Sequence, residues 1–389
     1  MIPNKPKYLY IAFDLFPSRK GAATHIYHCL KALKAQYGTG ILFCLGNDDM
    51  PKFQFDEESD LYIVRFKDKI VNFLERTVAF QQQLQTLLNN SLCSQLALIH
   101  FRDIWGGQVA LKTSSSIKKV FEVNSFQSIE LPTRYAGISI NAITQIKAIE
   151  KENLNGADAI ITPSLVTKKH IENEYNIQRN KVTVIQNGVT IINGKTKPSE
   201  IQKPYFLYFG ALQKWQGIKI LFKALKEIYD LDIKLVICSS ISEKRAVFHQ
   251  KLAEDIGVSS KILWYFELDK LALSGIIKNA LFTVAPLSQC DRNLIQGCNP
   301  LKIIESMGYG IPVIASDIPV ATCLINDNVD GFLVQPDRPE LLGRKIRQVL
   351  ADSKRIKKYG TAAKKKMNTQ YHWKQQELKM TTVYKQLSV

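Results

Sequence analysis

The chain lacks the closely spaced cysteines and histidines that build metal sites. Its seven cysteines are scattered over 389 residues, and no two of them have the CxxC spacing. Its six histidines include no HxxxH or HExxH pair. Because zinc ligands usually occur in such short-range pairs, we expect no protein-bound metal, and we expect reduced thiols that are mostly buried.

Long apolar runs are also missing. A membrane-spanning helix needs about 20 consecutive apolar residues, and no segment of the chain approaches that length. The apolar run 8–13 ends at Asp14, which makes it too short for the core of a signal peptide, and no cleavage-site pattern follows it. We therefore expect a cytosolic protein.

Acidic residues are few relative to basic ones. The chain has 35 aspartates and glutamates against 52 lysines and arginines, a formal net charge of +17. Such a surface attracts nucleic acid, anionic lipid head groups or phosphate-bearing substrates. The lysines are spread along the chain, with the densest cluster at 364–366, and no recognisable RNA- or DNA-binding motif accompanies them. We expect no nucleic-acid partner, while the inner face of a membrane stays open as a peripheral partner.

Short apolar runs alternate with segments of helical period, and this alternation occurs in two series. The apolar fraction of 46% and the charged fraction of 22% are those of a folded protein, and 389 residues suit two domains. The first series predicts strands at 8–13, 41–45, 61–66, 96–101, 119–123, 159–162 and 182–185, with helices near 22–36, 74–93, 140–155 and 165–176. After a predicted linker at 194–204, the second series predicts strands at 205–209, 234–238, 261–264, 281–285, 313–316 and 332–334. The pattern predicts an α/β fold of two Rossmann-like halves, with ligands at the carboxyl ends of parallel strands.

The most informative segment is 292–317, RNLIQGCNPLKIIESMGYGIPVIASD, which predicts a loop, a short helix and a buried strand. Asn299 is a favourable N-cap, and Pro300 suits the first helical position. On a helical wheel one face is apolar and the other carries Lys302, Glu305, Ser306 and Tyr309. Taken alone, Lys302 and Glu305 suit an exposed i,i+3 ion pair, worth about 0.2–0.5 kcal/mol.

The same segment resembles the donor-sugar signature of retaining GT-B glycosyltransferases of the family-four type, glycosyl transferases group 1, in the variant G-C-x-P-L-K-x-x-E-x-M. The resemblance implies that Glu305 binds the ribose hydroxyls of a nucleotide sugar. It also implies that the preceding loop approaches the sugar and the diphosphate, through Gly297, Cys298, Asn299, Pro300 and Leu301. A helix N-terminus favours phosphate, so this chemistry is consistent. The more widespread signature has an acidic residue where Gly297 stands, so that residue's contact with the sugar is not carried over.

Two other loops resemble parts of the same donor site. The loop 14–25 contains Gly21 and Ala22, which match a glycine-bearing turn over the diphosphate and sugar. The loop 209–217 contains Gly210, and relatives often carry an arginine and a lysine where Ala211 and Gln216 stand here. Because a diphosphate leaving group in a metal-free site needs cations, we predict that Lys302 and Arg292 supply them, with Lys214 as a weaker candidate.

In the first half, Asn124 follows a predicted strand, where many relatives carry a histidine near the reacting sugar. An amide can hydrogen-bond a sugar hydroxyl but cannot act as a general base. We therefore place Asn124 among the catalytic candidates without assigning it a proton. The resemblance implies a retaining front-face displacement in which the leaving phosphate assists deprotonation of the acceptor.

The resemblance also implies an organisation of the whole chain. Residues 1–196 would form the acceptor-side domain, 197–372 the nucleotide-sugar domain, and 373–389 a closing helix that crosses back to the first domain. In this fold the two domains face each other across a cleft. The expected partners are a nucleotide sugar and an unidentified acceptor, which is a glycan, a lipid or a small molecule, and no cofactor is expected.

Other functions stay open at this point. A nucleotide-sugar epimerase shares the double Rossmann layout, although the elaborate set of acids and histidines expected for C2 chemistry is missing. A non-catalytic protein that binds a polyanion or a nucleotide sugar fits the charge but leaves Lys302 and Glu305 unexplained. The metal-binding DxD of the other glycosyltransferase fold is matched by 230–232, but acids are common at the turn expected there.

Overall fold

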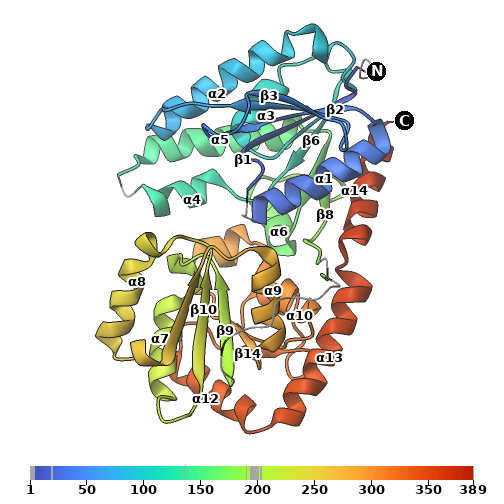
Figure 1. Cartoon of the computed structure of the whole chain (residues 1–389). Coiled ribbons are helices and arrows are strands. Elements are labelled where there is room, and N and C mark those ends of the chain that lie inside the picture. Colours follow the sequence, from blue (N-terminus) through green and yellow to red (C-terminus); the bar gives the residue numbers. More distant parts are fainter. Residues whose placement is uncertain are drawn as a thin grey trace. The chain divides into compact units, whose positions relative to one another are not determined.

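The computed structural model describes residues 5–18, 21–135, 137–189, 191–192, 201 and 204–388. It divides into two compact α/β units (Figure 1). Unit 1 comprises Met1–Gln186 and Gln376–Val389, and unit 2 comprises Asn187–Gln375. The alternation of strands and helices predicted from the sequence is therefore found in both halves.

The described part of unit 1 contains an eight-stranded sheet in the order β3-β4-β2-β1-β5-β6-β7-β8. All neighbours pair in parallel except β3, which runs antiparallel to β4 at the edge. The strands are β1 Tyr8–Leu15, β2 Gly40–Leu45, β3 Phe53–Asp56, β4 Leu61–Phe66, β5 Leu98–Phe101, β6 Lys118–Glu122, β7 Ala159–Thr162 and β8 Val182–Val184. The helices are α1 Gly21–Tyr37, α2 Phe73–Leu88, α3 Ile104–Ala110, α4 Gln127–Arg134, α5 Ile140–Gly156 and α6 Leu165–Glu174.

Three of these elements were not predicted, and each has a local reason. Strand β3 is a short edge strand whose residues are exposed or half-buried, so it has no apolar run to signal it. Helix α3 begins after Asp103, whose carboxylate caps it by accepting the Gly106 N–H at 2.7 Å, in a segment that reads as a glycine-bearing loop. Helix α4 contains Pro132, which weakens its helical signal.

The described part of unit 2 contains a six-stranded parallel sheet in the order β11-β10-β9-β12-β13-β14. Its strands are β9 Tyr205–Gly210, β10 Lys234–Ser239, β11 Ile262–Phe266, β12 Thr283–Ala285, β13 Val313–Ser316 and β14 Phe332–Val334. Its helices are α7 Ile218–Glu227, α8 Glu243–Ile256, α9 Lys270–Asn279, α10 Leu301–Gly308, α11 Pro319–Thr322, α12 Pro339–Leu350 and α13 Ser353–Gln370. Each sheet is buried on both faces by helices, which explains the continuous apolar runs of its strands.

Helix α14 (Trp373–Leu387) begins in unit 2 and belongs to unit 1 from Gln376 onward. Within unit 1 its Glu377 lies 2.6 Å from His28 of α1, and its Tyr384 hydroxyl lies 3.0 Å from His100 Nδ1. Met380 on the same helix is fully buried. The last helix thus completes the core of the first unit.

The division between the units falls at Asn187, earlier than the predicted end of the first domain at residue 196. Val189 explains the difference, because its N–H donates to the Tyr371 carbonyl at 2.7 Å, within unit 2. The predicted linker 194–204 lies mostly outside the described residues. In the part of the chain that the structure describes, no helix combines the length and the apolar character needed to cross a membrane.

Candidate functional site

Helix α10 forms where the sequence predicts it, but its N-terminus differs from the prediction. The cap position is Pro300, the helix begins at Leu301, and no side chain caps it. The predicted N-cap, Asn299, instead accepts the Asn187 N–H through its Oδ1 at 2.8 Å. The Asn187 side chain in turn donates to the Asn299 carbonyl at 2.9 Å. Asn299 is therefore used to hold the segment that enters unit 2, which no local pattern around 299 could show.

This arrangement leaves one donor in the loop unused. Because the Asn187 backbone N–H can only donate, the amide of Asn299 must present its oxygen to it. The Nδ2 of Asn299 is then buried and has no hydrogen-bond partner among the described residues. Gly297, two positions earlier, has φ 77° and ψ 167°, a conformation that residues with a side chain rarely adopt. The backbone therefore favours glycine where the more widespread signature has an acid.

The two faces of α10 are largely as predicted. Ile303, Ile304 and Met307 are fully buried. Ser306 was placed on the polar face but is also fully buried, because it accepts a hydrogen bond from the Thr283 hydroxyl of β12 at 2.8 Å. The serine thus fastens α10 to the sheet and does not face a ligand.

Lys302 is half-buried at the carboxyl end of β9. Its Nζ donates to Gln216 Oε1 at 2.6 Å and lies 3.9 Å from the centre of the Tyr208 ring. A Cβ on Gly210 would lie 3.6 Å from Lys302 Cε, so the backbone at the end of β9 approaches the lysine closely. Burial lowers the pKa of Lys302 to about 7, although the neighbouring Cys298 raises it slightly. An ammonium in this environment gains strongly from any anion that binds beside it.

Glu305 lies one turn further along α10 and is also half-buried. Neither a hydrogen bond nor an ion pair engages its carboxylate among the described residues, and it forms no pair with Lys302. Burial raises the pKa of Glu305 to about 7, while Lys270 lowers it slightly. The simple surface ion pair that the sequence allows is therefore absent from the described structure, and the carboxylate can accept hydrogen bonds from a ligand.

Of the remaining predicted residues of unit 2, Arg292 packs on a neighbouring ring and Lys214 is exposed. Arg292 opens the π-helix Arg292–Gln296, and its guanidinium stacks 4.5 Å from the centre of the Trp215 ring. The next residue, Asn293, donates to the Trp215 carbonyl at 3.0 Å, which joins this segment to the loop after β9. Lys214 belongs to the same loop but is exposed, and no described contact links it to Lys302.

The predicted residues of unit 1 lie at the carboxyl ends of its central strands. Gly21 begins α1 and is exposed, and Ala22 is half-buried. Asn124 follows β6 and is half-buried, with its Nδ2 donating to Glu122 Oε1. Arg102, which follows β5, bridges two carboxylates by donating to Asp14 at 2.9 Å and to Glu122 at 2.8 Å.

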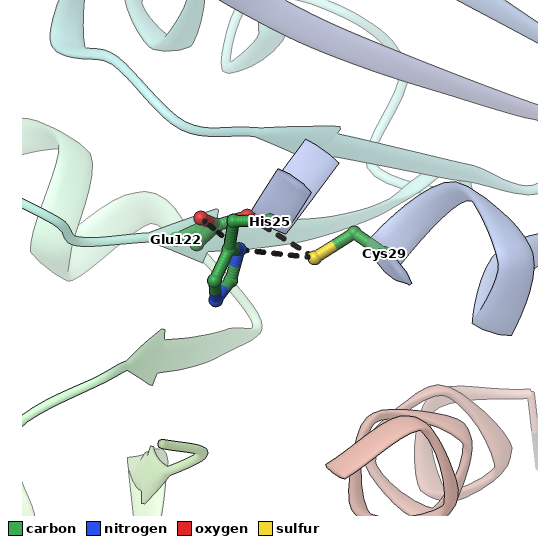
Figure 2. Close-up of side chains that lie close together, drawn as sticks. All are labelled: His25, Cys29 and Glu122. Carbon is green, nitrogen blue, oxygen red and sulfur yellow. Dashed lines mark hydrogen bonds and ion pairs between the residues drawn. The ribbon is translucent and has the colours of Figure 1, made fainter. Parts of the chain in front are cut away.

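Glu122 is fully buried and lies at the centre of a dense cluster that sequence reasoning did not find. Figure 2 shows its carboxylate beside His25 and Cys29 of α1. His25 Nδ1 lies 3.0 Å from Glu122 Oε1, and Cys29 Sγ lies 3.4 Å from Oε2. Four further groups contact the carboxylate oxygens of Glu122: the Tyr10 hydroxyl at 2.7 Å, His100 Nε2 at 3.1 Å, Arg102 Nη1 at 2.8 Å and Asn124 Nδ2.

The ligand atoms of His25, Cys29 and Glu122 lie within 4.8 Å of one another, close enough to hold a metal ion. The rest of the cluster argues against that interpretation. Arg102 already neutralises the carboxylate, and hydrogen-bond donors approach both of its oxygens. A cation would have to displace these donors and would lie beside a guanidinium. We interpret the cluster as a hydrogen-bonded, buried anion.

The structure thus brings Gly210, Lys302 and the 297–301 loop together at the carboxyl end of β9 in unit 2. Arg292 lies in an adjoining segment. Sequence reasoning missed the partners of these residues: Tyr208 beneath Lys302, Asn187 on Asn299, and Glu122 behind Asn124. Gln216 was noted only as a departure from the family pattern. The sequence carries no signal for such pairs, because they join segments that are far apart along the chain.

The two halves of the chain match two protein-family models. Residues 19–191 match the model described as Glycosyltransferase Family 4, and residues 193–366 match the model described as Glycosyl transferases group 1. An uncharacterized glycosyltransferase of Methanocaldococcus jannaschii, MJ1607, is 23% identical over 351 residues, which cover 87% of each chain. The O-antigen chain mannosyltransferase RfbU of Salmonella typhimurium is 28% identical over 182 residues, 46% of this chain and 47% of the relative.

Solved structures resemble the chain over nearly its whole length. Sucrose-phosphate synthase from Thermosynechococcus elongatus matches with a TM-score of 0.77 at 17% identity, covering 98% of this chain and 99% of that one. Anabaena HepE, solved in complex with UDP and glucose, matches with a TM-score of 0.74 at 14% identity, covering 98% and 100%. At these identities the likeness shows a shared fold.

Proposed function

Because this chain belongs to the GT-B glycosyltransferases of the family Glycosyl transferases group 1, we propose that it transfers a sugar from a nucleotide-diphosphate sugar with retention of configuration and without a metal ion. The acceptor is a glycan, a lipid or a small molecule. The observation that carries the proposal is the half-buried Glu305 carboxylate, which has no hydrogen-bond partner in the described residues and lies one turn from a half-buried lysine.

Glu305 would bind the ribose of the donor. Two ribose hydroxyls can donate to one carboxylate, and each charge-assisted hydrogen bond is worth about 1.5–3 kcal/mol. Burial opposes ionisation of this carboxylate, the charge of Lys270 offsets that only in part, and no described residue donates a hydrogen bond to it. A ligand with paired hydroxyls would supply the missing contacts.

Lys302, Arg292 and the start of α10 would bind the diphosphate. Lys302 donates to Gln216, a neutral side chain that a phosphate oxygen can replace. Asn299 Nδ2 adds a buried donor without a partner in the described residues, and the N-terminus of α10 adds backbone donors. These cations and donors stabilise the charge that grows on the leaving phosphate, which a metal ion provides in other transferases.

The chemical step would be a front-face displacement. The acceptor oxygen forms a bond to the sugar carbon, the bond from that carbon to the phosphate oxygen breaks, and the acceptor proton passes to the leaving phosphate. Asn124 takes no proton in this scheme, because an amide is not a base at neutral pH. Gly21 and Ala22 would lie near the donor's diphosphate and sugar.

A thermal-shift panel tests this proposal directly. The panel contains UDP, GDP, ADP and their common sugar conjugates, and UDP is included because HepE was solved with it. We expect one nucleotide series to raise the melting temperature, in accordance with mass action on the folded state. No stabilisation by any nucleotide or nucleotide sugar would overturn the proposal.

A further inference from the structure

The buried Glu122 carboxylate behind Asn124 has a fixed charge. Burial by itself would raise the pKa of Glu122, but the nearby His25 and Arg102 outweigh it and hold the pKa well below its ordinary value. Arg102 is itself held between Glu122 and Asp14. Glu122 therefore stays an anion, and an anion can only accept hydrogen bonds.

This one-sided chemistry determines how the neighbouring amide is turned. The atom of Asn124 that faces Glu122 must be its Nδ2, because a carboxylate oxygen would repel the amide oxygen. The amide oxygen, Oδ1, then points the other way and has no hydrogen-bond partner among the described residues. Asn124 is half-buried and follows the carboxyl end of β6, the edge at which parallel sheets bind ligands.

The Asp14 carboxylate is a second hydrogen-bond acceptor at this edge. Asp14 lies near the end of β1, and its side chain is 37% exposed. Arg102 holds it through the Nε donor, so the outer face of Asp14 also offers only acceptor oxygens. Two fixed acceptors suit the hydroxyl groups of a sugar and disfavour a phosphate.

We propose that Glu122 is a positioning residue, which turns the Asn124 amide so that Oδ1 accepts a hydrogen bond from a hydroxyl of a bound sugar. The inference rests on the proposed transferase function and adds to it a residue that does not itself touch the substrate. Glu122 would act through Asn124 and through the Arg102–Asp14 pair beside it. Its removal should change how the sugar is held and leave the nucleotide site of unit 2 untouched.

The first experiment observes the amide itself and needs no activity. The side-chain amide of Asn124 is followed by NMR in protein labelled with ¹⁵N-asparagine, and its signal is assigned by its loss in Asn124→Ala. We expect the signal to move in Glu122→Gln, because the anionic acceptor is lost. Glu150 provides the matched control: it is another buried carboxylate of unit 1, bound to Ser128 and Tyr175, and Glu150→Gln should leave the signal in place. An Asn124 signal that is unchanged in Glu122→Gln would overturn the proposal.

The second experiment measures function in the same variants. The probe is hydrolysis of the nucleotide sugar selected by the thermal-shift panel, with the nucleoside diphosphate alone as a second ligand. We expect Glu122→Gln and Asn124→Ala each to lower kcat/KM for the nucleotide sugar about tenfold, as the loss of one hydrogen bond predicts. The double variant should have the same kcat/KM as the less active of the two single variants, because the two residues act as one unit. The Kd of the nucleoside diphosphate should not change.

The outcomes separate this inference from the proposed function. Multiplicative effects of the two substitutions, or wild-type kinetics in Glu122→Gln, would overturn the positioning role even if transfer is confirmed. If no nucleotide sugar binds, the transferase proposal fails, while the NMR signal still decides how the amide is held. Should Glu122→Gln not fold, Asn124→Asp takes its place, since an aspartate cannot donate to Glu122 and should lose at least as much activity as Asn124→Ala. Wild-type activity of Asn124→Asp would contradict the proposal.

Discussion

At the scale of single residues, Lys302 and Glu305 do not form the exposed ion pair that their spacing allows, and each is half-buried among its own neighbours. Lys302 is held by Gln216 and the Tyr208 ring, whereas Glu305 has no described partner. Both have pKa values near 7, which burial shifts in opposite directions. Ionisable groups whose pKa values are shifted strongly by burial are typical of binding sites.

Glu305→Gln tests how much the half-buried Glu305 carboxylate lowers the free energy of unfolding. The folded state raises the pKa of Glu305 from 4.5 to about 7, so it binds the proton more tightly than the unfolded state does. The residue therefore contributes stability below pH 4.5, and this contribution is lost as the pH rises to about 7. Above pH 7 the neutral glutamine should increase the free energy of unfolding by about 1–3 kcal/mol.

The same variant should bind the nucleotide sugar at least tenfold more weakly, because the charge-assisted hydrogen bonds to the ribose are lost. Urea unfolding at pH 5 and pH 8 measures the stability, and calorimetry measures the donor affinity. A variant that is stabilised but still binds the donor normally would show that Glu305 is not the ribose ligand.

Lys302→Ala compared with Lys214→Ala tests the phosphate assignment. Leaving-group charge grows in the transition state, so a cation in contact with it affects the rate, typically by about 10²–10³. Lys214 lies on the loop after β9 but is exposed, which makes it a matched control for the loss of one positive charge. We expect a large loss of kcat only in Lys302→Ala. Steady-state kinetics with equal, small effects in both variants would mean that the phosphate site is misplaced.

At the scale of elements, the loop between β9 and α7 depends on the backbone at Gly217. This residue has φ 71°, and a Cβ on it would lie 1.7 Å from the Pro286 carbonyl oxygen. The short turn Lys214–Gln216 directly before it carries Trp215 and Gln216, the contacts of Arg292 and Lys302. A shift of Gly217 would therefore move the surroundings of both cations.

Gly217→Ala should destabilise the protein and weaken donor binding together. Gly257→Ala is the matched control, since Gly257 has φ 82° but open space around its Cβ position. The strain of a left-handed residue alone costs about 1–2 kcal/mol, which we expect for Gly257→Ala with donor binding intact. Gly217→Ala should cost more, because the Pro286 backbone must also move. Denaturant midpoints and calorimetry on both variants measure this, and equal losses would show that the close contact is unimportant.

At the scale of the whole molecule, the chemistry of the donor site should not depend on a divalent ion. The cations expected to serve the diphosphate come from side chains, Lys302 and Arg292, and from the helix N-terminus. We therefore expect EDTA to leave transfer unchanged. Restoration of activity by manganese after EDTA treatment would contradict this prediction. It would then make acidic side chains such as those of 230–232 candidate metal ligands.

The sequence determined the architecture, because the periodicity of apolar residues reports directly which residues are buried. Every strand of the unit 2 sheet was predicted within about two residues, and so was the position of α10 after its loop. The signature around Glu305 likewise predicts a candidate site from the sequence, since the loop, the helix start and the carboxylate lie next to one another along the chain. Elements without an apolar pattern, such as the exposed edge strand β3, were missed for the same reason.

Only the tertiary structure decided which polar groups meet. Asn299 accepts from Asn187 rather than capping α10, Lys302 bonds to Gln216 rather than to Glu305, and Glu122 gathers donors from α1, β1 and the ends of β5 and β6. The periodicity of apolar residues predicts which residues are buried, but it does not predict which polar groups become hydrogen-bond partners. A hydrogen bond joins two atoms within about 3 Å, and residues separated by tens or hundreds of positions reach that distance only when the packed sheets and helices place them there.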